Sequence, residues 1–504
     1  MERVSPPQVN YDNVLPLAIE SRSNRREFLP VNGQSFSNAN GATIVRIDVN
    51  ADSMLDATHS YIECDITNNA AATNFLALNP FTPAWIQRLR IESGGVVIED
   101  INEYARLYAL MTLNQCPEDY VKNNMSNMGL YDTAGSSALQ ATGGTPGFNI
   151  AAPAGVGGTG GFGVNTESEL HYPMSLQGQI KGTSRTTTTG VPADGATNAP
   201  TAAGLLAHSS KLASGNSKKL CFPLLSGFLN MDKYIPLIMM NAGFTIELTL
   251  CDANRIGTTQ VETAADQGAY SASAWSISGC KYVAHLIDLD RGFYDRLRAV
   301  MESSAGVLQL AGQTYRHYVG DMPAGAGPHT ITLPARVKSV KSIFGSFIDS
   351  GQMGSANNFD TSVFQSAFLD SYRFEIGSVR YPQTDVDANS EENFVELQKA
   401  FGKLGDFSHQ QAYAAKHTLN DNTARDGSDV VKALLSAYTI GYDFEAFQRV
   451  ALESGINTAD RSLPINFIAQ RTQATGGNAT RCDFYVLTDA IYYINLDGTV
   501  SVSV

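Results

Sequence analysis

One arrangement occurs twice in this chain, and the repetition limits what the chain can fold into. Residues 85–111 read WIQRLRIESGGVVIEDINEYARLYALM, and a similar stretch, SYRFEIGSVRYPQTDV, begins at Ser371. Both alternate apolar and polar residues around a central pair of turn-forming residues, and both lead into a segment with helical periodicity. A repeated hairpin and helix indicates two copies of one domain within a single chain.

The first hairpin is expected to turn at residues 94–95, because a Gly-Gly pair accepts the positive φ angles of a type I′ turn. A two-residue turn there places Ile91 opposite Ile98. Arg90 then lies opposite Glu99 on the other face, as a cross-strand pair of opposite charge.

The helix after the first hairpin has a recognisable start. Asp100, with Glu103 three residues later, has the spacing of a capping box. The helix is expected to place four large residues on one apolar face: Tyr104, Leu107, Tyr108 and Met111.

The second copy is expected to turn at residues 377–378, with Ile376 opposite Val379. Glu375 then faces Arg380, the same pairing of charges with the sides exchanged. Its helix has Ser390 as the expected N-cap, Glu391 and Glu392 in the first turn, and an apolar face formed by Phe394, Leu397 and Phe401.

Other segments repeat the same pattern. Apolar residues alternate with polar ones over residues 43–49, 61–66 and 244–250, which predicts half-buried strands. Late in the chain, LPINFIAQ and CDFYVLTDAIYYINLDG parallel the earlier FTIELTL and CKYVAHLIDLD. About eight strands in each half, with long connections, predict an all-β double jelly roll: two antiparallel β-sandwich barrels with short helices.

We divide the chain into an N-terminal arm (1–40), a first jelly roll (41–303) and a second jelly roll (304–504). Residues 117 to about 216 are rich in Gly, Ala, Thr and Ser and are expected to form a surface insertion in the first barrel. A short amphipathic helix is expected over residues 293–301. The arm carries Arg22, Arg25 and Arg26, so it is either a solvated segment or an extended arm that touches a neighbour or nucleic acid.

Composition supports a turn-rich β protein, with 44 glycines and only 17% charged residues. The net charge of -14 argues against broad nucleic-acid binding, which needs a basic surface. The N-terminus lacks the apolar region of a signal peptide. A membrane span is not expected either, because the sequence contains no run of about 18 apolar residues. The six scattered cysteines, without a CxxC pair, are expected to be free buried thiols in a reducing compartment.

No catalytic, cofactor-binding or metal-binding residues are expected, and no cofactor. The eight histidines are dispersed, without an HxH or HExxH pattern. Residues 155–160 match GxGxxG, but no strand leads into them and no helix follows. Leu404 stands after Gly402-Lys403 where a phosphate-binding loop needs Ser or Thr.

Three residues near the end of the first half were candidates for chemistry. Asp288 and Asp290 share one face of a strand, as general acid/base or calcium-binding carboxylates would. Their place at the strand end instead favours capping of the following turn or helix. His285 lies in an apolar strand and is expected in the core.

Five strings resemble the first half of double jelly-roll major capsid proteins, particularly those of polinton-like viruses and virophage-related small DNA viruses. They are LDATHSYIECDITNN, AWIQRLRIESGGVVIEDINEYARLYALM, FPLLSGFL, KYIPLIMMNAGFTIELTL and YVAHLIDLD. They lie between about residues 40 and 300, and the second half is similar in layout.

The resemblance implies a structural protein of the virion, not an enzyme, made inside the host cell. Two barrels per chain would stand perpendicular to the shell, and three chains would form a capsomer of hexagonal outline. Such capsomers would tile an icosahedral capsid, with a separate penton protein at the vertices. The insertion would lie on the outer face. The arm would lie at the inner base, against neighbouring capsomers, minor capsid proteins or, weakly, the genome.

Two other functions remain open. A duplicated β-barrel enzyme of the cupin type predicts two or three histidines and a carboxylate that converge inside a barrel. A carbohydrate-binding or adhesin-like β-sandwich protein would usually be secreted. Metal content and glycan binding distinguish these from a capsid protein.

Overall fold

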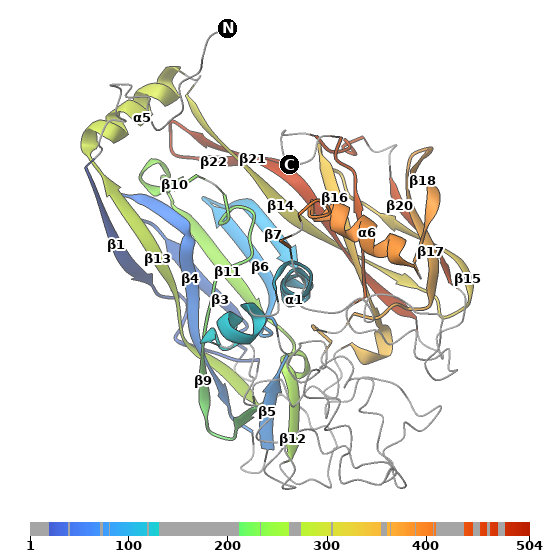
Figure 1. Cartoon of the computed structure of the whole chain (residues 1–504). Helices are drawn as coiled ribbons and strands as arrows, with labels where there is room; N and C mark the ends of the chain where they lie inside the picture. The colour runs from blue at the N-terminus through green and yellow to red at the C-terminus, as the bar shows by residue number, and fades with distance from the viewer. Residues whose placement is uncertain are drawn as a thin grey trace.

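The structure is a computed structural model of the whole chain, and it consists mainly of antiparallel strands (Figure 1). It describes residues 20–38, 41–70, 74–79, 81–117, 120–125, 127–130, 211–231, 233–261, 274–303, 306–353, 360–362, 364–388, 390–406, 408–409, 438–446, 454–460, 464–471 and 479–504.

The first barrel packs two sheets face to face. The β1 sheet has the order β1-β13-β4-β10, with β2 and β9 paired to β13 and β4. Its strands are β1 (Ser21–Phe28), β2 (Ser35–Phe36), β4 (Met54–Asn68), β9 (Ser217–Phe222), β10 (Ile235–Pro236) and β13 (Trp275–Leu289). The β3 sheet has the order β3-β11-β6-β7, formed by β3 (Ile44–Val49), β6 (Ile86–Ser93), β7 (Val96–Asn102) and β11 (Phe244–Leu250).

The second barrel repeats this plan. The β14 sheet has the order β14-β21-β16-β19, with β22 paired to β21. Its strands are β14 (Val307–Met322), β16 (Val340–Asp349), β19 (Thr439–Asp443), β21 (Thr480–Asn495) and β22 (Val500–Ser503). The β15 sheet has the order β15-β20-β17-β18, formed by β15 (Gly327–Leu333), β17 (Leu369–Ile376), β18 (Val379–Asp387) and β20 (Ile465–Arg471).

The main strands of the two barrels have the same order. β1, β13 and β4 match β14, β21 and β16, while β3, β11, β6 and β7 match β15, β20, β17 and β18. Several connections cross between the two sheets of a barrel, as from β3 to β4 and from β15 to β16, which is typical of the Greek-key pattern of a jelly roll. The predicted double jelly roll is confirmed. The domain boundary at 303/304 stays a prediction.

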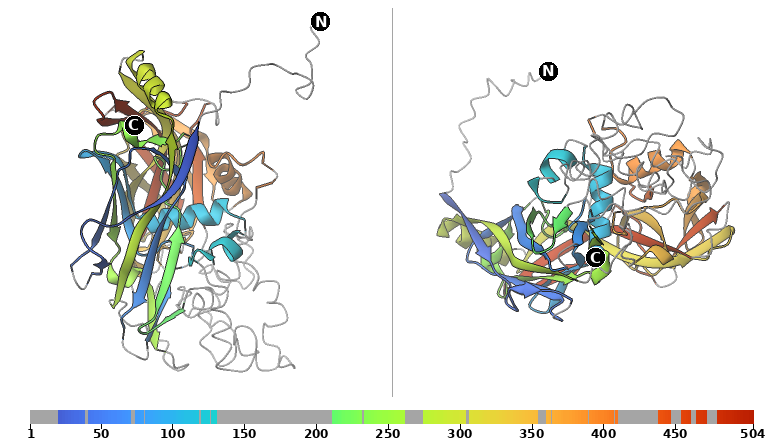
Figure 2. Two further views of the ribbon diagram at one scale, coloured as in Figure 1. Left: turned by 90° about the vertical axis from the view of Figure 1, so that its left-hand side faces the viewer. Right: turned by 90° about the horizontal axis from the view of Figure 1, so that it is seen from below.

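Among the described residues, three α-helices connect these strands. α1 (Tyr104–Gln115) follows β7, α6 (Glu391–Ala400) follows β18, and α5 (Arg291–Ser303) joins β13 to β14. Figures 1 and 2 show α1 between the two barrels. Shorter turns of helix are η2 (Tyr120–Met125), η4 (Leu237–Met239), η5 (Ala253–Arg255) and η6 (Ser350–Gln352).

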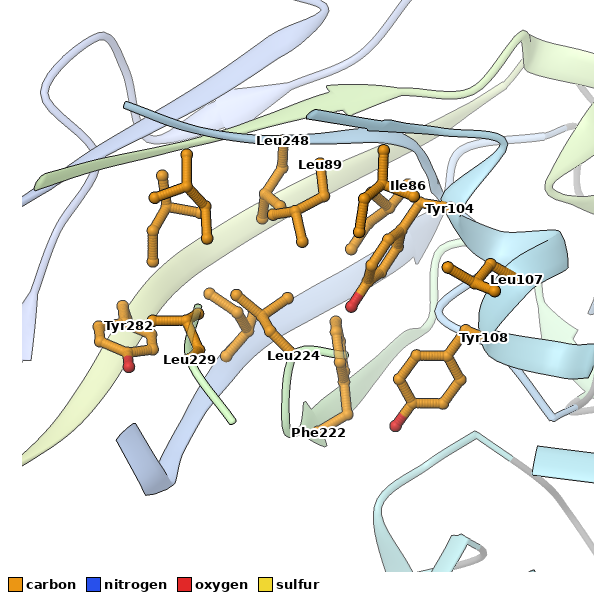
Figure 3. Packing of buried hydrophobic residues seen from close by; sticks show 14 of the residues in the cluster. Ile86, Leu89, Tyr104, Leu107, Tyr108, Phe222, Leu224, Leu229, Leu248 and Tyr282 are labelled. Carbon is orange, nitrogen blue, oxygen red and sulfur yellow. The ribbon is translucent and has the colours of Figure 1, made fainter. Parts of the chain in front are cut away.

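The predicted alternation is confirmed in the core. In β3 every second residue is fully buried, and β11 follows the same pattern. Figure 3 shows Leu89 and Leu248 of the β3 sheet facing Leu224 and Tyr282 on the opposite side. Burial of a side chain of this size stabilises the fold by about 1.5–3 kcal/mol, so these two apolar layers hold the sheets together.

The first hairpin differs from the prediction in its register. The turn is as expected, since Gly94 and Gly95 have φ angles of 55° and 86°. However, Ile91 pairs with Glu99 and Arg90 with Asp100, because a β-bulge inserts one residue into β7. The expected pairs with Ile98 and Glu99 were therefore wrong. The bulge lets two successive residues be buried, Ile98 at 4% exposure and Glu99 at 2%.

The expected capping box is also wrong. Asp100 lies within β7, where its carboxylate accepts from Arg88 Nε at 2.7 Å. Glu103 occupies the N-cap position of α1 in a left-handed conformation, with φ 50°, and its side chain makes no cap hydrogen bond. Its carboxylate binds arginines instead.

The second hairpin follows the prediction. Ile376 pairs with Val379 and Glu375 with Arg380. Ser390 caps α6, because its side chain accepts from the backbone N–H of Glu392. Of the expected apolar face, Leu397 is fully buried, while Phe394 and Phe401 are half-buried.

The N-terminal arm is shorter than predicted. Residues 21–28 form β1, an edge strand paired along its whole length with β13. Because seven of its eight residues are exposed, its sequence lacks the alternation that marks a half-buried strand. Residues 1–19 lie outside the described residues.

Most of the expected insertion lies outside the described residues, since 118–119, 126 and 131–210 are not described. At its end, β8 (Lys211–Ala213) joins a small sheet with β5 (Asn74–Leu78) and β12 (Gly257–Val261). All six cysteines are free thiols; Cys64, Cys251, Cys280 and Cys482 are buried. Among the described helices, none has the length and apolar character needed to span a membrane.

Candidate functional site: the charged seam between the barrels

The residues that sequence reasoning considered for chemistry are held in structural contacts. Asp290 accepts from the backbone N–H of Gly292 at 3.1 Å at the start of α5, as the capping prediction expects. Asp288 instead accepts from Asn24 of β1 at 2.9 Å. His285 is half-buried, with its ring 6.1 Å from the ring of exposed His59, so its expected core position was wrong.

Other motifs fall in different places. The GxGxxG match at 155–160 lies outside the described residues, whereas Gly402 and Lys403 form the turn after α6. Within the described part of the chain, no group of three or more His, Cys, Asp or Glu residues is arranged so that it could hold a metal ion. The structure thus adds no metal-binding candidate there.

Of the three N-terminal arginines, two make contacts within the first barrel. Arg25 forms ion pairs with Glu27 at 3.0 Å and with Glu63 at 3.9 Å. The guanidinium of Arg26 lies 5.0 Å from the centre of the Phe28 ring. Because successive side chains of a strand point to opposite faces, these two arginines lie on opposite faces of β1.

The strongest concentration of buried charge lies elsewhere, where α1 enters the space between the barrels. We call it the charged seam. It consists of three arginines and three carboxylates drawn from both barrels: Glu103, Arg106, Arg255, Asp360, Arg481 and Asp483.

Helix α1 is buried on nearly all sides, because it contacts both its own barrel and the second barrel. Against its own barrel, the hydroxyl of Tyr104 accepts from Leu225 N at 2.6 Å, and the ring of Tyr108 packs edge-on against Phe222. Against the second barrel, the hydroxyl of Tyr485 donates to the carbonyl of Glu103 at 3.0 Å. No polar face is left for solvent, unlike a surface helix.

Arg106 is the centre of the seam and is fully buried. Its Nε lies 3.1 Å from Oδ2 of Asp483 on β21, and its Nη2 donates to Ser346 Oγ at 3.2 Å. Its Nη1 donates to the carbonyl of Asp360, and its guanidinium stacks 5.0 Å over Phe364. One side chain of the first barrel thus contacts three segments of the second.

A second set of ion pairs continues the seam. Arg255 of η5 makes two hydrogen bonds to the Glu103 carboxylate, at 2.7 and 3.1 Å, and one to Asp360 at 2.8 Å. Arg481 of β21 binds Glu103 at 2.9 Å and Asp483 at 3.0 Å. Such bidentate contacts are the strong form of the ion pair.

The seam holds Asp483 and Glu103 ionised. Burial alone would raise the pKa of Asp483, but the hydrogen bond from His317 and the charges of Arg106 and Arg481 hold that pKa well below its ordinary value. For Glu103, the charge and hydrogen bonds of Arg255 likewise outweigh burial and lower the pKa. The three positive and three negative charges therefore compensate one another in the interior.

Beside the seam, Glu99 is buried in a different environment. It accepts from Thr314 Oγ1 of β14 at 2.8 Å, from the backbone N–H of Gly227 at 2.9 Å and from Ser226 Oγ. Burial outweighs these hydrogen bonds and raises its pKa. Next to it, β7 and β14 border a groove of about 550 Å³ that Val502 and Val504 also line.

This arrangement suits a mechanical role. Every charged side chain of the seam is engaged by a partner of opposite charge. The seam connects the two barrels. Arg481 Nη2 lies 2.9 Å from Oε1 of Glu103, although the two residues are 378 positions apart in the sequence. Sequence reasoning missed it because isolated charges such as Arg106 and Asp483 give no local signal, apart from their place within apolar runs.

Comparison with known proteins agrees with this plan. No family model matches the chain, and neither does any curated protein. Among solved structures, it is similar over 98% of its length to VP54 of PBCV-1, fitted into a reconstruction of the virophage Sputnik; 99% of that chain is covered, with a TM-score of 0.56 and 10% identity.

Two further solved structures are similar. The Faustovirus major capsid protein matches with a TM-score of 0.53 and 10% identity, covering 96% of this chain and 93% of that one. A chain of the Sputnik virophage matches with a TM-score of 0.51 and 9% identity, covering 100% and 93%. The likeness shows the fold: this chain has the double jelly roll found in viral major capsid proteins.

Proposed function

We propose that this chain is the major capsid protein of a small DNA virus, and that three copies form a capsomer of hexagonal outline that tiles an icosahedral shell. The observation that carries the proposal is that the main strands of the two barrels have the same order. Three chains with two like barrels each present six like barrels around a three-fold axis.

The charged seam supports this function. A tile must keep its two barrels at a constant angle, since every tile must meet its neighbours in the same way. Buried ion pairs across the seam oppose sliding of one barrel on the other, because any displacement would leave charges uncompensated. The seam therefore makes the two barrels one rigid unit.

Exposed strand edges give further support. β1 and β18 are edge strands at opposite sides of the molecule (Figures 1 and 2), and both are largely exposed. Long open edges invite pairing or association, and proteins normally cover them. Copies of the same chain in a capsomer would supply that cover.

In this proposal the barrels are the units 41–303 and 304–504, with β1 added to the first. Neighbouring capsomers, a penton protein and minor capsid proteins are the proposed partners in the virion. Contact of the N-terminal arm with the genome is proposed as weak, because Arg25 is already paired with Glu27 and Glu63. The absence of enzymatic activity is part of the same proposal.

No observation favours the cupin-type enzyme or the carbohydrate-binding protein. Metal analysis of the purified protein tests the first, since a barrel metal site predicts one equivalent of metal per barrel. A glycan array tests the second.

Sedimentation of the purified protein tests the proposed function. We expect a stable species of about three times the 54.1 kDa chain mass. A protein that stays monomeric at high concentration and in the presence of its capsid partners would overturn the proposal.

A further inference from the structure

We propose that helix α5 binds the surface of a lipid bilayer that contains anionic lipid, with one apolar stripe of the helix among the acyl chains and its arginines at the headgroups. The helix lies on the bilayer and does not cross it. This inference goes beyond the proposed function, because it concerns a single chain as much as a trimer and names lipid as a further partner of the protein.

Helix α5 stands apart from the cores of the two barrels. In Figure 1 and in the left view of Figure 2 it lies beyond the ends of the strands, at one end of the molecule. Of its 13 residues, only Met301 is buried. The strand equivalent to β13 in the second barrel, β21, leads into a short turn and β22 instead of a helix. The repeated barrel plan therefore does not explain a helix of this length at this place.

One side of α5 carries an apolar stripe that is open to solvent. Phe293, Leu297 and Val300 follow one another at positions i, i+4 and i+7, so they share one side of the helix. Val300 is 53% exposed, and the other two are only partly buried. The neighbouring Tyr294 and Met301 face the protein, since the Tyr294 hydroxyl accepts a hydrogen bond from a backbone N–H of β13 at 3.3 Å. The barrel thus covers only one border of the apolar side of α5.

The charged residues of α5 are sorted around its apolar side. At about 100° per residue, Arg296 borders the exposed stripe, and Arg298 lies at the other limit of the apolar side, beyond Met301. Asp295 and Glu302 lie together on the opposite side, and all four charged side chains are exposed. On a bilayer, the arginines could lay their methylene groups along the apolar surface and reach the phosphates, while the carboxylates would stay in water.

The arginines of α5 are available for an anionic ligand. Arg291, Arg296 and Arg298 are exposed, and none of them forms an ion pair with another described residue. Exposed arginines on the strands differ in this respect, because Arg25 pairs with a glutamate at 3.0 Å and Arg46 with another at 3.3 Å. A guanidinium can bind a phosphate group through two parallel hydrogen bonds.

Two exposed apolar side chains extend the surface next to α5. Leu496 lies in the turn after β21, and its backbone N–H donates to the carbonyl of Gly306, just after α5, at 2.8 Å. Tyr234 directly precedes β10, which lies at the same end of the molecule in Figure 1. A tyrosine suits the boundary between acyl chains and headgroups, because its ring is apolar and its hydroxyl is polar.

Lipid is the occupant that satisfies both the stripe and the arginines. Nucleic acid supplies phosphate groups but no apolar phase. Residues 14–19, which read VLPLAI, supply apolar side chains but no anion. They precede Glu20, whose carbonyl accepts from the backbone N–H of Asp290 at the start of α5, so they are the rival occupant that the test has to separate.

In the proposed capsomer, α5 would face the inside of the shell. β8 follows the insertion and pairs with β5, and β5 lies at the end of the molecule opposite α5 in Figure 1. An insertion on the outer face of the shell would therefore set α5 on the inner face. A lipid layer beneath the shell is the surface that α5 would meet there.

Flotation of the full-length chain with lipid vesicles tests the inference. The vesicles contain phosphatidylcholine alone, or equal parts of phosphatidylcholine and phosphatidylserine. One variant carries Phe293→Ser with Val300→Ser, and a second carries Arg296→Gln with Arg298→Gln. Circular dichroism first establishes that each variant is folded.

Matched controls make the same kinds of change away from α5. Leu29→Ser with Val31→Ser removes two exposed apolar side chains beyond the far end of β1. Lys218→Gln with Lys219→Gln removes two positive charges from β9, which lies at the end opposite α5 in Figure 1. A further variant of the full-length chain, Leu15→Ser with Leu17→Ser, makes the rival run less apolar.

We expect the parent to bind the vesicles with phosphatidylserine at least about tenfold more tightly than those without it, because each arginine near an anionic surface contributes about fivefold in affinity. The apolar variant and the arginine variant should each lower that affinity by about tenfold or more. Both matched controls and the Leu15→Ser with Leu17→Ser variant should bind as the parent does. Added salt should weaken the binding, since it screens the arginines.

Three results would overturn the inference. The first is a parent that binds neither kind of vesicle, and the second is binding that neither α5 variant reduces. The third is binding that is lost only in Leu15→Ser with Leu17→Ser, because the contact would then belong to the N-terminal run. An arginine variant that binds as the parent does would contradict the role given to the headgroups.

If the apolar variant fails to fold, Val300→Ser alone replaces it, with an expected loss of about fivefold in affinity. Affinity equal to that of the parent then opposes the contact. The vesicle assay is separate from the mass measurement of the proposed function. A monomer that binds vesicles contradicts the capsomer and supports the lipid contact, whereas a trimer that binds none does the reverse.

Discussion

The Nε atom of Arg106 lies 3.1 Å from Oδ2 of Asp483, and this ion pair joins helix α1 of the first barrel to β21 of the second. Both side chains are completely buried. Removing one partner of a buried pair leaves the other charge without compensation, which costs far more than loss of a surface pair. Four predictions test this seam and the assembly built on it.

Replacement of Arg106 tests the seam directly. Arg106→Met keeps much of the side-chain volume but removes the positive charge that lies beside the Asp483 carboxylate. We expect the free energy of unfolding to fall by about 3–5 kcal/mol, measured by urea denaturation. Asp483→Leu added to Arg106→Met should recover part of that loss, because both charges are then absent.

The matched control is Arg88→Met. Arg88 pairs with Asp100 on the surface of the first hairpin, with side chains 39% and 33% exposed. Exposed pairs of this kind contribute about 0–1 kcal/mol. If Arg88→Met and Arg106→Met lower the free energy of unfolding equally, the buried ion pair of the seam contributes no more to stability than an exposed pair.

Acid should weaken the seam. The native-state pKa values of Asp483 and Glu103 lie below their ordinary values, so the native state binds fewer protons than the unfolded state in acid. Their stabilisation is complete above the unfolded pKa of about 4 and is lost as pH falls through the lower native value. Stability should therefore decline steeply below about pH 4.

Asp483→Asn provides the comparison for that pH dependence. Removing one titrating group should reduce the slope of the unfolding free energy below pH 4 by up to about 1.4 kcal/mol per pH unit. If the variant keeps the parent slope, Asp483 does not contribute to acid sensitivity.

Substitution of Gly227 tests how closely the two barrels approach each other. A Cβ atom built on Gly227 would lie 1.4 Å from the backbone carbonyl oxygen of Gln313 in β14, so no side chain fits there. Gly227→Ala should cost about 1–3 kcal/mol or separate the barrels locally. Gly325→Ala is the control, because nothing lies within 4 Å of its added methyl group. Similar thermal midpoints for the two variants would contradict the close approach.

Deletion of residues 135–205 tests the insertion. If the insertion packs with its copies in the proposed capsomer, the deleted chain should express and fold but yield fewer trimers. Sedimentation of the deleted and complete chains makes the comparison. Normal trimer formation after the deletion would show that the insertion is no assembly element.

Much of the fold followed from local patterns. Alternation placed β3 and β11, the pair at 377–378 placed the second hairpin with its register, and Ser390 identified the start of α6. Each of these depends on residues that are neighbours in the sequence. For that reason the repeated layout of strands, hairpin and helix, and with it the double jelly roll, could be predicted.

The errors arose where distant contacts decide the local structure. The bulge in β7 turns Glu99 toward Thr314, which is 215 residues away, and no turn rule contains that contact. Glu103 does not cap the helix with its side chain, because its carboxylate binds Arg255 and Arg481. β1 was not predicted, because an exposed edge strand does not alternate between apolar and polar residues. The seam itself could not be predicted, since its charges come together only in the folded chain.

Imaging of the purified protein in negative stain tests the central claim most directly. If six like barrels surround a three-fold axis, averaged views along that axis should show one particle with six lobes of similar size, at a mass of about three times 54.1 kDa. Particles with two lobes only, at the mass of a single chain, would contradict the account.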